Sequence, residues 1–142
     1  MKVYISCPIR GLQVTPETYG TPEATKIVQE NCQKATVFVN KLRERFPDIE
    51  FHNPAAWDLE VFISVAFQLK YLTEKQILAV DCEIIETSDL VIFFNYEGTF
   101  SRGMQIERDY AVDHDKRYII WKDANNGLFD EIEFIKGLLD GK

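Results

Sequence analysis

The stretch DLVIFFNYEGTFSRGMQIERDYA, residues 89–111, predicts a buried strand, a loop and the start of a helix. Leu90–Phe94 is an unbroken run of apolar, strand-favouring residues, as is typical of a parallel strand covered on both faces. Ser101 stands at an N-cap position, and Gly103 would let a ligand approach the first helical turn closely. The free N–H groups of that turn favour an anion. The segment therefore predicts an α/β fold with its chemistry at the turn.

Two acids stand at helical positions where the pattern otherwise asks for an apolar residue. At about 100° per residue, Glu107 falls on the packing face of the helix that follows the strand. Asp81 falls in the middle of the apolar arc of the preceding helix, which begins at a capping-box pattern, Thr73–Gln76. Capping of a backbone N–H at the helix start would explain the position of Glu107, but it would not explain that of Asp81. Two buried carboxylates on either side of one strand instead suggest a site.

Strands alternate with helices along the rest of the chain. Further strands are predicted at 2–7, 49–52 and 117–121. The pattern predicts one α/β domain over residues 1–142, with a doubly wound, flavodoxin- or Rossmann-like parallel sheet of four to five strands and helices on both faces. Ligands bind such sheets at the carboxyl ends of strands where the strand order reverses. The loop with Arg10 and the loop with Ser101 would meet there.

Composition limits the classes of function. Hydrophobic residues make up 46% and charged residues 27% of the chain, which is ordinary for a soluble globular protein, and no apolar run is long enough to span a membrane. With 16 Lys and Arg against 23 Asp and Glu, the net charge of −7 argues against nucleic acid as a partner. The first residues contain no secretory h-region, so we expect a cytoplasmic protein.

Cysteines and histidines do not predict a metal site. Cys7, Cys32 and Cys82 are odd in number and have no CxxC spacing, which fits a reducing compartment without a disulfide framework. His52 has no second ligand at metal spacing, and the neighbours of His114 diverge on a helix end. We therefore expect neither a metal nor another cofactor.

The segment 57–72 is more apolar than one helical stripe can bury, because Val61–Ile63 is followed at once by Val65–Phe67. Two interpretations are open. Part of the apolar surplus faces a second subunit in a homodimer or higher homo-oligomer, or the helix is sandwiched between the sheet and its neighbours.

Three motifs carry a family resemblance. VYISCPIRG, residues 3–11, is similar to an opening strand and phosphate loop, and SRGMQIERDYA, residues 101–111, is similar to a nucleophile motif. Asp81 lies on the predicted helix before Asp89, which begins the third strand, and this position is similar to that of a catalytic aspartate on a helix. Together they resemble the nucleoside 2-deoxyribosyltransferase superfamily, above all its 2'-deoxynucleoside 5'-phosphate N-hydrolases.

The resemblance implies a role for each matched residue. Glu107 would be the nucleophile at the anomeric carbon, Asp81 the acid that protonates or orients the base, and Tyr4 a hydrogen-bond donor to Glu107. Two carboxylates across an oxocarbenium-like transition state form the retaining glycosidase scheme. The implied substrate-binding residues are Cys7, Ile9, Arg10, Gly11, Ser101 and Gly103. Asn125 would stand for a polar group that relatives donate to the site from a second subunit.

Ser101 bears on the choice between hydrolase and transferase. In the transferases of this superfamily, the residue at the matching position is an acid. That acid holds a free 5'-hydroxyl and would repel a phosphate. Ser101 with Arg10 favours a nucleotide, so the expected function is hydrolysis of the N-glycosidic bond of a nucleoside or deoxynucleoside 5'-monophosphate. A deoxyribosyltransferase and, from another class, a non-catalytic nucleotide sensor are the alternatives.

Overall fold

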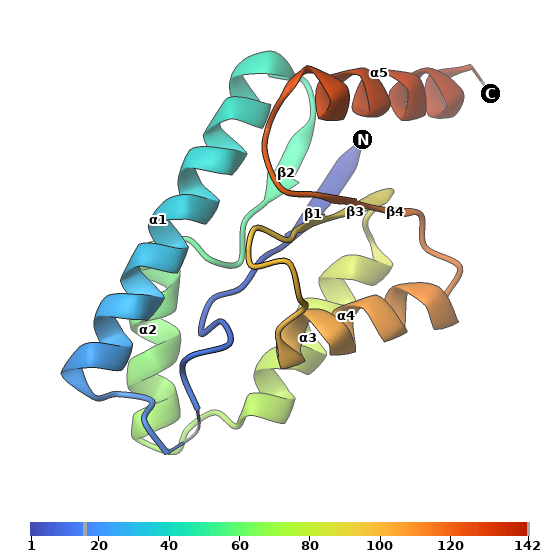
Figure 1. The fold of residues 1–142 in the computed structure, drawn as a ribbon. Coiled ribbons are helices and arrows are strands. Elements are labelled where there is room, and N and C mark those ends of the chain that lie inside the picture. Colours follow the sequence, from blue (N-terminus) through green and yellow to red (C-terminus); the bar gives the residue numbers. More distant parts are fainter. Residues whose placement is uncertain (16, 142) are drawn as a thin grey trace.

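In the computed structural model, which describes residues 1–15 and 17–141, parallel strands form a sheet between layers of helices (Figure 1). The strands are β1 (Lys2–Ser6), β2 (Glu50–His52), β3 (Leu90–Phe94) and β4 (Tyr118–Trp121). The helices are α1 (Pro22–Arg45), α2 (Trp57–Gln68), α3 (Glu74–Glu86), α4 (Arg102–Asp113) and α5 (Asn126–Asp140).

The described residues form four strands, which are all parallel and lie in the order β2-β1-β3-β4. In the central pair, Tyr4 lies opposite Val91 and Ser6 opposite Phe93. The chain moves outward from β1 in one direction and from β3 in the other, so the strand order reverses between these two strands. The predicted doubly wound, flavodoxin-like α/β fold is therefore confirmed, with four strands in the sheet.

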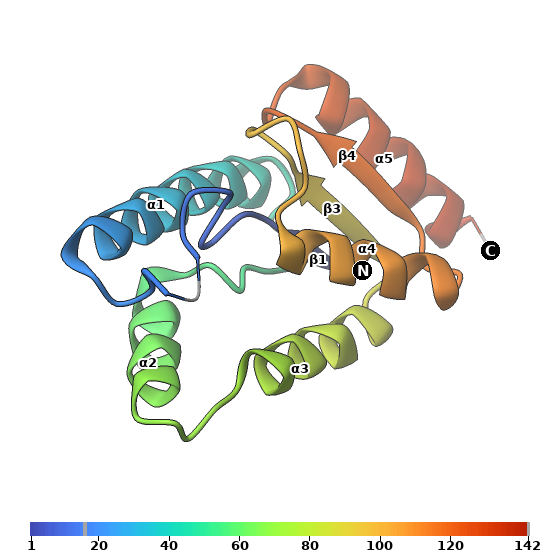
Figure 2. The same ribbon diagram turned by 60° about the horizontal axis from the view of Figure 1, so that its bottom comes forward.

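Helices cover both faces of this sheet. Alternate residues of β1 and β3 point to opposite faces. Val3 and Ile5 belong to the core beneath α1 and α5, whereas Tyr4 and Phe93 pack with residues of α3 and α4. Figure 2 shows α3 and α4 near each other on the same side of the sheet. Tyr4 therefore lies on the face of the sheet against which α3 and α4 pack.

Side-chain caps mark the starts of several helices, and the predicted starts at Thr73 and Ser101 are confirmed. Thr21 accepts a hydrogen bond from the N–H of Ala24 at 3.3 Å. Thr73 and Gln76 form the full capping box, in which each side chain accepts the backbone N–H of the other residue, at 3.1 Å and 2.9 Å. Ser101 is the N-cap of α4. Local sequence thus determines where the helices around the site begin.

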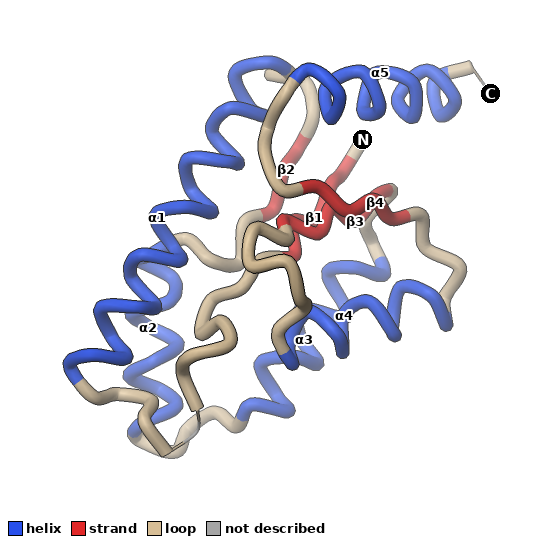
Figure 3. Tube along the Cα trace, viewed as in Figure 1, coloured by secondary structure: helices blue, strands red, loops and turns tan. Residues whose placement is uncertain are grey.

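Helix α2 lies beside α1 and away from the strands (Figure 3). Glu60 is its only fully buried residue, and Phe62 is 71% exposed. The interpretation of α2 as a helix sandwiched between the sheet and its neighbours is therefore wrong, because α2 does not cover the sheet. Within residues 1–15 and 17–141, no helix combines the length and the apolar character that crossing a membrane requires.

Candidate active site

A cavity of about 240 Å³ opens at the carboxyl end of β1, where the strand order reverses. Its walls come from the loop after β1 and from the inner sides of α2, α3 and the start of α4. Every predicted site residue except Asn125 lines it, namely Tyr4, Cys7, Ile9, Arg10, Gly11, Asp81, Ser101, Gly103 and Glu107. The fold thus brings together residues that the sequence places on four different elements.

Glu107 is held by two hydroxyl groups of β1. Its Oε2 accepts a short hydrogen bond from the Tyr4 hydroxyl, and its Oε1 accepts one from the Ser6 hydroxyl at 2.9 Å. Glu107 is 5% exposed, and Tyr4 and Ser6 are fully buried. A side chain with both oxygens held in this way has a fixed orientation towards the cavity. The helix-cap explanation for Glu107 is not needed, because its partners are on the sheet.

The two predicted acids both have raised pKa values. Burial raises the pKa of Glu107 to about 8, with the charge of Asp81 as a second cause, while the hydrogen bonds from Tyr4 and Ser6 act in the opposite direction. Burial also raises the pKa of Asp81 to about 7, with the charge of Glu60 as the second cause. Interacting acids of this kind titrate as a unit. The site can therefore hold a shared proton near neutral pH.

Tyr4 and Cys7, which also line the cavity, are neutral. Burial, followed by the charges of Glu107 and Asp81, raises the pKa of the Tyr4 phenol well above its usual value, so this hydroxyl remains a donor. Burial likewise raises the pKa of the Cys7 thiol. Since a thiolate is the nucleophilic form of cysteine, Cys7 is suited to packing and not to attack.

The loops after β1 and β3 meet beside the cavity, as predicted. Gly11 has a φ of +71°, and a Cβ there would lie 2.9 Å from the carboxylate of Glu97 in the loop after β3. Glu97 in turn accepts the N–H of Leu12 at 3.3 Å. Asn31 of α1 donates to the carbonyl of Ile9 at 2.9 Å. Gly11 therefore allows a close approach that fixes the loop carrying Arg10.

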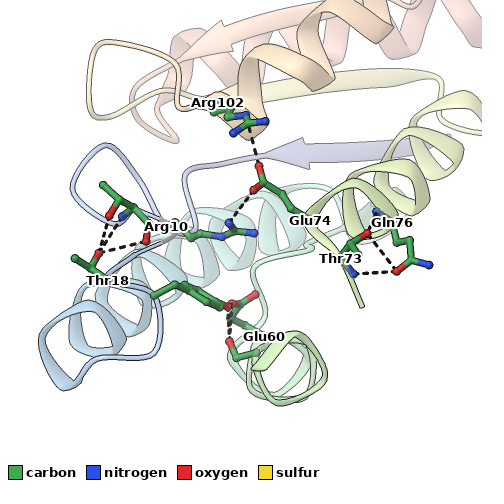
Figure 4. Close-up of polar contacts among 10 residues, drawn as sticks. Arg10, Thr18, Glu60, Thr73, Glu74, Gln76 and Arg102 are labelled. Atoms are coloured by element: carbon green, nitrogen blue, oxygen red, sulfur yellow. Dashed lines mark hydrogen bonds and ion pairs between the residues drawn. The ribbon is translucent and has the colours of Figure 1, made fainter. Parts of the chain in front are cut away.

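The expected anion-binding groups lie on one wall of the cavity, but they have partners. Arg10 forms an ion pair with Glu74 at 3.5 Å, and Arg102 reaches the other oxygen of Glu74 at 3.6 Å (Figure 4). The Ser101 hydroxyl accepts the N–H of Met104 at 3.5 Å and keeps its own proton to donate. Glu74 was not predicted as part of the site.

Another buried acid was also missed. Glu60 of α2 is 3% exposed and lines the cavity. Its Oε1 accepts hydrogen bonds from the hydroxyls of Tyr19, at 2.7 Å, and Ser64, at 2.9 Å. Burial raises its pKa, although the two hydroxyls and Arg10 act in the opposite direction. The available signal was an acid directly before Val61 in the apolar segment 57–72, which contains one other acid, Asp58.

Asn125 lies outside the cavity lining. Its side chain accepts the N–H of Leu128 at 3.1 Å and caps α5. Within one chain it is thus a helix cap. Among the described residues, no group of three or more His, Cys, Asp or Glu side chains is arranged to hold a metal ion.

Comparisons with protein families, with curated proteins and with solved structures found no match. The fold and the site by themselves define a doubly wound α/β protein with an acid-lined cavity at the reversal of strand order.

Proposed function

We propose that this protein hydrolyses the N-glycosidic bond of a nucleoside or deoxynucleoside 5'-monophosphate and releases the free base and the sugar 5-phosphate. One observation carries the proposal. Glu107 is a buried carboxylate in a cavity that it shares with Asp81, and its two oxygens are oriented by the hydroxyls of Tyr4 and Ser6. Paired, oriented carboxylates are what a retaining glycosidase requires.

The reaction assigns one role to each acid. Glu107 attacks the anomeric carbon of the sugar, the carbon–nitrogen bond breaks, and its electron pair leaves with the base. Asp81 gives its proton to the departing base. A water molecule then adds to the anomeric carbon and splits the glycosyl ester of Glu107, while Asp81 takes a proton from that water. The enzyme thereby returns to its starting protonation state.

The hydrogen bonds favour this assignment of charge. Hydrogen bonds to a carboxylate favour its charged form, and Glu107 accepts two of them from neutral hydroxyls. Burial and the charge of Asp81 nevertheless leave the pKa of Glu107 at about 8, above the value of about 7 for Asp81. The proposed reaction uses the form of the pair in which Glu107 is ionised and Asp81 carries the proton, and the hydrogen bonds from Tyr4 and Ser6 favour that form.

The phosphate assignment is supported by the groups on one cavity wall. Arg10, Arg102 and the Ser101 hydroxyl line the cavity with the first turn of α4, around Gly103. Guanidinium groups and a helix N-terminus both suit a phosphate. Binding energy from the phosphate would position the sugar against Glu107.

A deoxyribosyltransferase is the second candidate, and Glu74 is the observation that favours it. This acid lies on the cavity wall and is paired with both Arg10 and Arg102. A carboxylate at that wall would suit a free 5'-hydroxyl better than a phosphate. In such a transferase a second base, in place of water, would take the sugar from Glu107.

We also propose a homodimer as the active form, in the cytoplasm. The exposed apolar face of α2 supports the dimer, since Val61, Phe62 and Val65 are 42%, 71% and 50% exposed. The three cysteines are all free thiols, which suits a reducing compartment.

Incubation with a panel of deoxynucleosides and their 5'-monophosphates, each with and without a second free base, tests the proposal. Chromatography follows the free base and any new nucleoside. We expect base release from monophosphates and little from nucleosides. Rapid sugar transfer from unphosphorylated nucleosides, with little hydrolysis of monophosphates, would replace the hydrolase by the transferase.

A further inference from the structure

Glu74 lies between two arginines that come from separate parts of the chain. Arg10 belongs to the loop after β1, Arg102 is the first residue of α4, and Glu74 is the first residue of α3. Figure 4 shows both guanidinium groups directed at the Glu74 carboxylate, which uses one oxygen for each. The carboxylate thus occupies the position that a bound anion would take between the arginines.

The two ion pairs are loose. Their N–O distances are 3.5 Å and 3.6 Å, longer than the 2.7–2.9 Å that is usual for a charge-assisted hydrogen bond. The Arg102 side chain is 76% exposed, and the side chains of Arg10 and Glu74 are about a quarter exposed. Ion pairs with this much solvent contribute little to stability. An anion that forms shorter contacts can therefore replace Glu74 at small cost.

Arg10 has a second set of contacts that does not involve Glu74. Its guanidinium carbon lies 4.8 Å from the ring centroid of Tyr19 and 5.6 Å from that of Phe67. Cation–π contacts of this kind hold the guanidinium in place. Loss of the Glu74 contact therefore leaves Arg10 oriented towards the cavity.

Donor groups on this wall outnumber the Glu74 carboxylate. Arg10, Arg102, the Ser101 hydroxyl and the first turn of α4 line the cavity, and Glu60, the other acid near Arg10, accepts hydrogen bonds from the hydroxyls of Tyr19 and Ser64. A phosphate offers more oxygens than the Glu74 carboxylate and can contact both arginines and Ser101 together. The phosphate and Glu74 nevertheless repel each other.

We propose that Glu74 is an internal competitor for the phosphate site, which the phosphate of the substrate must displace from Arg10 and Arg102. Glu74 thereby sets how tightly the site holds a phosphate and how strongly it prefers phosphorylated over unphosphorylated ligands. The identification of the natural ligand as a phosphorylated substrate rests on the proposed function. The competition itself is measured with inorganic phosphate, which requires no turnover.

Calorimetric titration with inorganic phosphate at constant ionic strength tests the inference. Glu74→Gln keeps the size of the side chain and removes its charge, and Glu83→Gln, an exposed acid on the same helix, is the matched control. We expect Glu74→Gln to bind phosphate about 3-fold to 10-fold more tightly than the wild type, because loose ion pairs and a like charge are lost. Glu83→Gln should bind as the wild type does.

A double variant links the effect to the arginine. Adding Arg10→Gln to Glu74→Gln should abolish the tighter binding, since the released guanidinium is then absent. Phosphate binding by Glu74→Gln that is unchanged, weaker or undetectable would overturn the inference and would make Glu74 a support for the arginines. Tighter phosphate binding without any base release from nucleotides would leave the inference standing and reject the proposed hydrolase.

Discussion

The Tyr4 hydroxyl donates a hydrogen bond to the Glu107 carboxylate across 103 positions of sequence. Tyr4 is a strand residue of the smaller of the two buried apolar clusters, and Glu107 is a buried helix residue. The contact joins the sheet to α4 directly beneath the cavity. Catalytic function in this account depends on that junction.

Tyr4→Phe should lower the rate of base release by about 10-fold to 100-fold, because a donor to the reacting carboxylate is lost. Loss of that donor also raises the pKa of Glu107, so the acidic limb of the kcat/KM profile should move to higher pH. Tyr118→Phe, on the same face of the sheet, is the control. A Tyr4→Phe enzyme with the wild-type rate and pH profile would contradict the role.

Asp81→Asn should reduce kcat by about 100-fold or more, which is typical for loss of a general acid. The loss should be smaller for substrates whose base leaves readily without a proton. Asp109→Asn, an exposed acid on α4, should retain full activity. Equal loss for good and poor leaving groups would show that Asp81 does not act as the acid.

The stability of the protein should fall as pH rises through the pKa of Glu107. Burial raises the folded-state pKa from 4.5 to about 8, so the protonated form favours the folded state. This contribution is fully present below about pH 4.5 and is lost as pH rises through about 8. Glu107→Gln should reduce this dependence, by an amount on the order of a few kcal/mol. Thermal unfolding between about pH 5 and pH 9 measures how the stability of each protein depends on pH. The same dependence in the wild type and in Glu107→Gln would disprove the contribution of Glu107.

Phe62→Asp should convert the proposed homodimer to a monomer, because it places a charge in the exposed apolar face of α2. Phe134→Asp is a matched control, since Phe134 is 66% exposed on α5. Light scattering at micromolar concentration gives the mass of each. A wild-type protein that is monomeric and fully active would remove the basis for the dimer.

Local sequence predicted the parts of the fold that local interactions determine. Leu90–Phe94 is the buried strand that its apolar run predicts, and Ser101 and Thr73 cap their helices as predicted. The first strand ends at Ser6, one residue before the predicted Cys7, because the chain leaves the sheet before Pro8. Boundaries of this kind depend on pairing between strands and not on propensity alone.

Helical position also predicted two of the acids that line the cavity, Asp81 and Glu107. Ser6 could have been found from its strand, because it follows Tyr4 by two positions and so shares its face. The pairing of Arg10 with Glu74 could not be predicted, because it depends on how α3 is placed against a loop far away in sequence. Glu60 was missed because its segment was interpreted by its apolar residues alone.

The most direct test of the central claim is release of free base from deoxynucleoside 5'-monophosphates by the wild-type protein and by Glu107→Ala, followed by chromatography. Circular dichroism shows that the variant is folded. The account predicts that the wild type releases one base for each sugar 5-phosphate formed, and that the folded variant releases none. Equal base release by the folded Glu107→Ala protein, or no release from any monophosphate by the wild type, would contradict it.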